Sequence, residues 1–337
     1  MAKKPAAAKP KQFYGRAEWY GELYHLMKQS RRLELLGTSN TKIDCPYFLQ
    51  VPALGPKSGK TNCNKIGGVC SIRNFHEPKG DADLSFGPIT ATCPNRFLEN
   101  GTIVEHIAGF VLGTDNPLLA KEIPFLRRPK DPTAAQAVEV TDKEDHEAEL
   151  IEEDGEDAAK EDVGRIDLVF VHPDNPEKWC AIEMQAVYFS GAGMAKDDAN
   201  IKSMGIDANG VPFPGGGRRP DFRSSGPKRL MPQLLIKVPT LRRWGKKMVI
   251  IIDRPFLDAM DKMDQVDDIS NCDIIWVVVR FDETEVPGKA TLVIDSTVMT
   301  TLEDSVQGLT AGSATTLGEF EDKLSKRLRT AKKVLDA

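Results

Sequence analysis

Two stretches of this chain, residues 248–252 and 274–279, are apolar at every position. They lie within Lys247-Met-Val-Ile-Ile-Ile-Asp253 and Asp273-Ile-Ile-Trp-Val-Val-Val-Arg280. Continuous runs rich in β-branched residues are typical of central strands, whose two faces are both covered by other elements. Patterns with helical spacing occur elsewhere in the chain, and strands mixed with helices form layered cores. We therefore predict a core of mixed strands and helices, either α/β or α+β.

The chain divides into three parts by composition. Residues 1–39 begin with a basic tail, and apolar residues at roughly helical spacing predict a helix over 14–36. Residues 40–96 are rich in Gly, Pro, Asn and Cys, and residues 97–337 contain the strand patterns. The glycine-rich segment 205–217 predicts a loop. Residues 317–335 predict an amphipathic helix with Thr316 as its N-cap.

The formal net charge of −5 hides an uneven distribution. Residues 131–162 hold 14 acidic and 2 basic residues, so the rest of the chain carries a net charge of +7. We interpret this acidic segment as an exposed insertion. Residues 218–247 hold 10 Lys or Arg residues and one acid, which is the electrostatic signature of a surface that binds phosphates. The residues that we expect to contact DNA are Arg218, Arg219, Arg223, Lys228 and Arg229.

Polar residues interrupt an apolar β-hairpin in the middle of the chain. Its strands are Arg165-Ile-Asp-Leu-Val-Phe-Val-His and Trp179-Cys-Ala-Ile-Glu-Met-Gln-Ala-Val. Asp167 lies on the first strand, and Glu183 and Gln185 share one face of the second. A buried carboxylate is costly unless it is paired or bound to a metal. Two carboxylates on rigid strands predict a Mg²⁺ site suited to phosphodiester hydrolysis by a metal-activated water.

Four of the six cysteines lie within one short segment, at Cys45, Cys63, Cys70 and Cys93. Four thiolates in a segment with few apolar residues predict a structural metal, whose binding would stabilise the fold. Thiolates accept both zinc and iron. Two disulfides are the alternative, which a reducing compartment disfavours. Cys180 and Cys272 accompany predicted strands and are expected to be ordinary buried cysteines.

Other classes of protein remain open at this point. A DNA-binding module with a structural metal and no cleavage activity would share the basic stretch and the cysteines. A ββα-metal nuclease is suggested only by His172 and Asn175 beside the four cysteines. No apolar run reaches the ~18 residues of a membrane span, and the basic N-terminus lacks the apolar core of a secretory signal. We expect a cytoplasmic protein that does not enter membranes.

The hairpin and the cysteines together resemble one nuclease family. Asp167 followed by Glu183-x-Gln185 is similar to the PD-(D/E)xK core with its final Lys replaced by Gln. Together with a four-cysteine segment that ends in Cys93-Pro94, this pattern resembles the NotI-like Type II restriction endonucleases. The resemblance implies an α/β fold whose nuclease core is a mixed sheet flanked by helices. The resemblance extends over about residues 40–280, so the basic tail lies outside it, and the acidic insertion is a departure from it.

This resemblance implies a homodimer that cuts double-stranded DNA at a GC-rich palindrome and leaves 5′-phosphates, accompanied by a cognate DNA methyltransferase. It implies iron on the four cysteines, and Asp167 and Glu183 as ligands of the catalytic Mg²⁺. Gln185 then stands where a lysine usually orients the attacking water, but an amide carries no charge. A second metal ion would supply that charge, and Glu105 and Glu161 are candidates for a further carboxylate.

Overall fold

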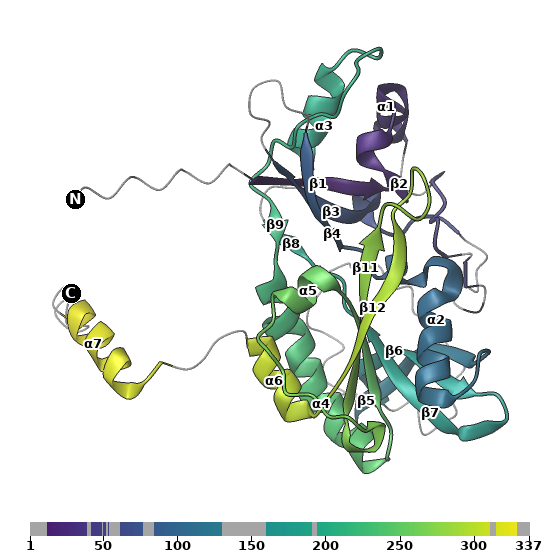
Figure 1. Ribbon diagram of the computed structural model, residues 1–337, viewed down its shortest axis with the longest axis vertical. Helices are drawn as coiled ribbons and strands as arrows, with labels where there is room; N and C mark the ends of the chain where they lie inside the picture. The colour runs from purple at the N-terminus through teal and green to yellow at the C-terminus, as the bar shows by residue number, and fades with distance from the viewer. Residues whose placement is uncertain are drawn as a thin grey trace.

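The computed structural model describes residues 12–38, 42–48, 50–51, 53, 61–76, 84–129, 160–190, 194–310 and 315–328. Among them are a four-stranded sheet and a six-stranded sheet, one above the other in Figure 1. The N-terminal part contains β1 Gln12–Trp19, β2 Glu22–Leu23, η1 Tyr24–Leu26, α1 Gln29–Gly37, η4 Ile66–Gly68, β3 Val69–His76, β4 Ser85–Ala91, η5 Pro94–Gly101, α2 Thr102–Ile107 and η6 Ala108–Leu112. The middle part contains β5 Leu118–Pro129, β6 Lys160–His172, β7 Asn175–Met184, β8 Phe189–Ser190, α3 Ala195–Ser203, β9 Arg219–Pro220, η8 Ser224–Leu230 and α4 Met231–Arg243. The C-terminal part contains β10 Met248–Asp253, α5 Arg254–Asp258, η9 Ile269–Asn271, β11 Ile274–Asp282, β12 Thr291–Thr300, α6 Leu302–Thr310 and α7 Leu317–Leu328.

The six-stranded sheet has the order β12-β11-β10-β7-β6-β5. Strand β10 runs parallel to both β7 and β11, and the outer pairs are antiparallel, so the sheet is mixed. Every residue of β10 is buried, as its continuous apolar sequence predicts. One face packs under α2 and the other under α4 and α6, which gives two apolar clusters separated by the sheet. The predicted α/β fold with a mixed sheet flanked by helices is confirmed.

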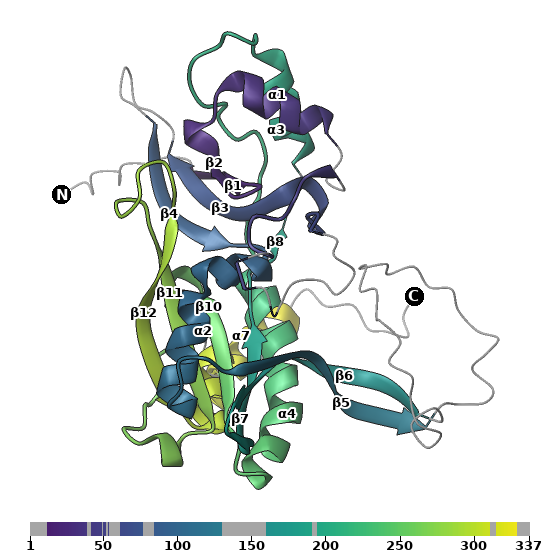
Figure 2. The ribbon, with the colours of Figure 1, turned by 90° about the vertical axis from the view of Figure 1, so that its right-hand side faces the viewer.

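Strands β5 and β6 form a long ribbon that projects from this sheet, as Figure 2 shows. The acidic segment connects the outer end of this ribbon, and most of it lies outside the described residues, as does the basic tail. No helix in the described ranges is both long enough and apolar enough to cross a bilayer.

The N-terminal region differs from its sequence-based prediction. Residues 12–19 form strand β1, which pairs with β3, and the only α-helix within the predicted 14–36 helix is α1. Arg16 and Glu18 of β1 are buried, because Arg16 pairs with Asp198 and Glu18 pairs with Arg96. The described part of 1–39 therefore shares one antiparallel sheet with the cysteine-rich segment, in the order β2-β1-β3-β4.

The two sheets are joined by hydrogen bonds at the end of β10. The carboxylate of Asp253 accepts the Ala91 N–H of β4 at 2.6 Å and the Phe256 N–H of α5 at 2.9 Å. The Val187 N–H, just after β7, donates to the Ala91 carbonyl at 2.8 Å. The residues that follow the hairpin are therefore fixed against the N-terminal sheet.

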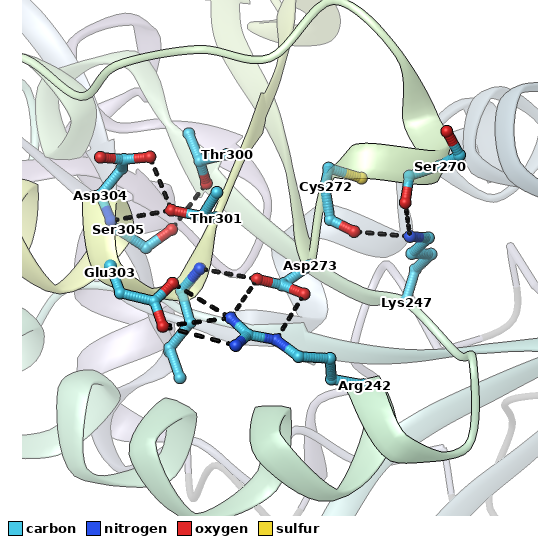
Figure 3. Close-up of polar contacts among 11 residues, drawn as sticks. Arg242, Lys247, Ser270, Cys272, Asp273, Thr300, Thr301, Glu303, Asp304 and Ser305 are labelled. Carbon is cyan, nitrogen blue, oxygen red and sulfur yellow. Dashed lines mark hydrogen bonds and ion pairs between the residues drawn. The ribbon is translucent and has the colours of Figure 1, made fainter.

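Helix α4 is anchored at its C-terminal end (Figure 3). Arg242 pairs with Asp273 at 2.5 Å and with Glu303 of α6 at 3.0 Å. Asp273 also accepts the Leu302 N–H at 3.0 Å, so one carboxylate links α4, the start of β11 and α6. The position of α4 over the sheet is thus fixed by charge as well as by apolar packing.

Candidate active site

The hairpin predicted from the sequence is present, and it brings its two carboxylates together. In the β6–β7 pair Leu168 lies opposite Ile182, which places Asp167 beside Glu183 at the end of the pairing. The Met184 N–H donates to Asp167 Oδ2 at 3.0 Å, and the Asp167 N–H is hydrogen-bonded to the Glu183 carboxylate. Each strand thus holds the carboxylate of the other through its backbone.

Glu183 is almost fully buried on the face of the sheet that is covered by α4. Its neighbour across the β7–β10 pair is Ile250, and only 4% of the residue is exposed. Burial first, and then the nearby carboxylate of Asp167, raise the pKa of Glu183 to about 7, while the charge of Lys237 opposes this rise. A bound cation would stabilise the ionised form of this carboxylate, which burial and the charge of Asp167 disfavour.

Lys237 of α4 supplies a cation that the sequence analysis missed. Its Nζ forms an ion pair with Glu183 Oε1, and both side chains are almost fully buried. It also donates to Gln233 Oε1 at 3.1 Å, one turn earlier in the helix. The signal was present in the sequence, because Lys237 falls on the same helix stripe as the apolar residues Leu234, Val238 and Leu241.

The other candidate polar residues lie in different places. Gln185 is half-buried, and its side-chain amide donates to the Ala186 carbonyl at 2.6 Å. Glu105 lies on α2, whose buried side chains Ile103 and Ile107 belong to the apolar cluster on the opposite face of the sheet. It therefore does not join Asp167 and Glu183. The side chain of Glu161 lies outside the described residues.

The basic residues follow the hairpin closely in space. Strand β9 pairs with β8, and Tyr188 holds the segment after β9 through Asp221 and Ser225, at 2.6 and 3.0 Å. Four of the predicted DNA-contacting residues are exposed: Arg219, Arg223, Lys228 and Arg229. The guanidinium of Arg229 lies 3.7 Å from the ring centroid of Tyr188. Because Tyr188 is only three residues beyond Gln185 in the chain, this exposed charge lies close to the end of the hairpin.

The prediction for Arg218 needs correction. Its side chain is buried and pairs with Asp197 of α3, and it also donates to the Tyr14 carbonyl at 3.2 Å. A guanidinium held in this way ties α3 to the N-terminal sheet and is not presented to a DNA phosphate. Residue type and local charge gave the same prediction for all five residues, and only burial separates them.

The four clustered cysteines are all buried and form no disulfide among the described residues, and the same holds for Cys180 and Cys272. Cys45 and Cys63 flank an antiparallel bridge, with Cys45 N–H to Thr61 O at 2.7 Å and Cys63 N–H to Ile43 O at 2.8 Å. The Cys93 N–H donates to the Cys70 carbonyl at 3.2 Å. Burial first, and also the neighbouring thiols of Cys45 and Cys93, raise the pKa of Cys63 to about 11. The thiols of Cys45 and Cys93 therefore lie near enough to Cys63 to affect its pKa, and the alternative of disulfides is not observed.

The profile of the restriction endonuclease NotI family matches this chain over residues 32–140 and 130–292. These ranges include the four clustered cysteines, the hairpin, α4 and the two strands that follow it, β10 and β11. The chain belongs to the NotI restriction endonuclease family. No curated protein matches it.

Membership of the NotI family makes the chain a sequence-specific restriction endonuclease, a hydrolase that binds double-stranded DNA. This agrees with the exposed basic residues beside the hairpin. Enzymes of this class generally use Mg²⁺, which commonly keeps several waters and takes only one or two protein carboxylates. The Asp167–Glu183 pair is a donor set of that kind.

The cysteines of this NotI family member fit a metal by their chemistry, because buried thiolates suit iron or zinc. The arrangement of the four side chains in space, however, does not by itself show a metal site. Within the described ranges, no three His, Cys, Asp or Glu side chains are arranged as they would be around an ion. The four-sulfur centre predicted from the sequence is therefore not shown by this geometry, although Cys63 is influenced electrostatically by Cys45 and Cys93, and Cys70 by Cys93 and Cys63.

Proposed function

We propose that this chain is a Mg²⁺-dependent endonuclease that cuts both DNA strands at a GC-rich palindrome and leaves 5′-phosphate ends. The observation that supports this most is the meeting of Asp167 and Glu183 on adjacent strands, on the face where Glu183 is buried. Rigid strands hold both carboxylates, so little reorganisation is needed to bind an ion. Bound Mg²⁺ would lower the pKa of a water and polarise the scissile phosphate.

The protein's own residues have separate tasks in this proposal. Asp167 and Glu183 would hold the ion, each oriented by a backbone N–H of the opposite strand. Gln185 would orient the attacking water as a neutral hydrogen-bonding group. Arg219, Arg223, Lys228 and Arg229 would bind the DNA backbone or read guanine in the major groove.

The test is digestion of plasmid and genomic DNA with the purified protein and Mg²⁺, followed by end mapping. Asp167→Ala and Glu183→Ala are expected to bind the target and to lose cleavage, by about 100-fold or more. Glu177→Ala is the matched control, because this carboxylate lies exposed on the same hairpin. Cleavage retained by either site variant contradicts the assignment. DNA that is bound and never cut by the unaltered protein favours a non-cleaving DNA-binding protein.

We also propose a structural iron, or zinc, on Cys45, Cys63, Cys70 and Cys93. Their burial, their mutual influence on pKa and the backbone N–H groups directed at Cys45 and Cys93 support it. Elemental analysis of protein purified without added metal should give one ion per chain. Serine at Cys45 and Cys93 should remove that ion and lower the melting temperature. Serine at Cys180, which is buried elsewhere, should leave the metal content unchanged.

A palindromic target implies a symmetric enzyme, because each half-site presents the same groups to one subunit. We therefore propose that the active form is a homodimer, which light scattering on the protein with and without DNA would test. A methyltransferase that modifies the same sequence would protect the host DNA. Its gene is expected near the gene for this chain.

A further inference from the structure

A buried lysine faces the carboxylates of the candidate active site from the helix above them. Lys237 Nζ pairs with Glu183 Oε1 and donates to Gln233 Oε1 at 3.1 Å. The exposed fractions of the Lys237 and Glu183 side chains are 6% and 5%, so water screens this pair very little. The charge therefore acts directly on the site.

The packing of α4 against the sheet fixes the position of Lys237. Leu234, Val238 and Leu241 lie on the same stripe of α4 and are fully buried against the sheet. At the end of the helix, Arg242 is fixed to Asp273 and Glu303 (Figure 3). Rotating α4 to expose Lys237 would expose these apolar side chains as well, so the ammonium is held over Glu183.

Stability alone is a weak reason for this ion pair. Desolvating two charges offsets most of their attraction, and well-packed apolar residues usually replace such a pair without loss. Charge is needed, however, where a phosphodiester is cut, because negative charge accumulates in the transition state. Gln185 is neutral and turns its amide toward the Ala186 carbonyl. Lys237 brings a fixed positive charge to the same face of the sheet.

We propose that Lys237 is a positioning residue of the cleavage site, which holds one oxygen of Glu183 and supplies the positive charge that Gln185 lacks. The inference rests on the proposed nuclease function. It assigns part of the charge stabilisation to the protein, from a helix that follows the hairpin by about fifty residues in the chain. A second metal ion is then not required to replace a strand lysine.

The test separates charge from folding with four variants. Lys237→Gln keeps a hydrogen-bond donor and removes the charge, and Lys237→Arg keeps the charge. The double variant Lys237→Gln with Gln185→Lys moves the charge to the strand. Lys247→Gln is the control, because Lys247 lies immediately before β10 and donates to the carbonyls of Ser270 and Cys272 instead of pairing with Glu183 (Figure 3).

Two measurements are made on each variant: the single-turnover rate of cleavage with Mg²⁺, and the affinity of the DNA-free protein for Mn²⁺ by calorimetry. Lys237→Gln should cut about 100-fold more slowly, the usual cost of losing one preorganised charged donor. It should also bind Mn²⁺ several-fold more tightly, because a neighbouring positive charge has been removed. Lys237→Arg should keep much of the rate, the double variant should regain part of it, and Lys247→Gln should behave as the unaltered protein.

Wild-type cleavage by Lys237→Gln overturns the proposal. So does a slow Lys237→Gln variant that binds Mn²⁺ more weakly and is not rescued by Gln185→Lys, because that combination marks a purely structural ion pair. If the unaltered protein cuts no DNA, the proposed function fails separately. In that case the role of Lys237 is judged from the Mn²⁺ affinity alone. If Lys237→Gln binds Mn²⁺ no more tightly than the unaltered protein, the proposed role of Lys237 is wrong.

Discussion

Arg218 and Arg229 belong to the same basic stretch, yet their guanidinium groups have opposite surroundings. Arg218 is buried against Asp197, with side chains 0% and 6% exposed, whereas Arg229 lies on the surface over the ring of Tyr188. A buried pair leaves an uncompensated charge when one partner is removed. An exposed cation over an aromatic ring is fixed in direction and still free to meet a phosphate.

Alanine at these two positions should therefore give opposite phenotypes. Arg218→Ala should lower the free energy of unfolding by about 3–5 kcal/mol, because Asp197 stays buried without its partner. Arg229→Ala should leave folding within about 0.5 kcal/mol and weaken DNA binding. Its loss should also reduce the slope of log K against log salt by about 0.9, the value for one phosphate contact. Urea unfolding and binding titrations at several salt concentrations measure both effects. An unchanged salt slope for Arg229→Ala would argue against its contact with DNA.

At the scale of elements, short polar contacts decide how strands and helices meet. Asp253 ends β10, caps α5 through the Phe256 N–H and holds the Ala91 N–H of β4. Asp268 also caps a short turn, η9, but its carboxylate is exposed and bonds only locally to Ser270. Asp253 caps through the N–H three residues further on and Asp268 through the N–H two residues further on, but only Asp253 also links two sheets.

Asp253→Ala should lower the free energy of unfolding by about 2–4 kcal/mol, since a helix cap is lost and a buried N–H loses its acceptor. Asp268→Ala is the matched cap variant and should cost clearly less. Urea unfolding of both variants makes the comparison. Equal losses would show that the link to Ala91 contributes nothing beyond capping.

Helices and strands were predicted correctly from the sequence where the pattern depended only on residues that are neighbours in the chain. The apolar runs became β10 and β11, and the hairpin became β6 and β7 with its carboxylates adjacent. Thr316 caps α7 as predicted, since its Oγ1 accepts the Glu319 N–H at 3.3 Å. The predicted helix over 14–36 was wrong, because β1 buries Arg16 and Glu18 in pairs with distant residues. Local spacing cannot reveal partners that are so far away in the chain.

In the molecule as a whole, the two large sheets of the described part share a connected apolar interior. One apolar cluster contains Trp19 and Phe75 of the first sheet together with Ile182 and Ile251 of the second. Arg96 strengthens this junction by pairing with Glu18 and donating to the Ala290 carbonyl. Helix α7 differs, because all of its side chains are exposed and it stands away from the sheets in Figure 1.

A chain that ends at Thr310 lacks α7 and should keep the melting temperature of the full chain, because every described residue that is removed is exposed. A chain that ends at Thr301 also lacks α6, whose Leu302 and Leu309 are buried, and should melt at a clearly lower temperature. Differential scanning calorimetry compares the three proteins. A large decrease on loss of α7 alone would show that this helix stabilises the folded body.

The central strands, the hairpin and its two carboxylates could be predicted from the sequence, because they depend on the alternation and burial of neighbouring residues. Which charged side chains are buried, and with which partners, became known only from the three-dimensional fold. The fold paired Arg218 with Asp197, placed Lys237 on Glu183 and removed Glu105 to the other face of the sheet. Pairs of this kind join residues that are distant in the chain. Their electrostatic energy depends on separation and solvent exposure, which are defined only once the helices lie against the sheet.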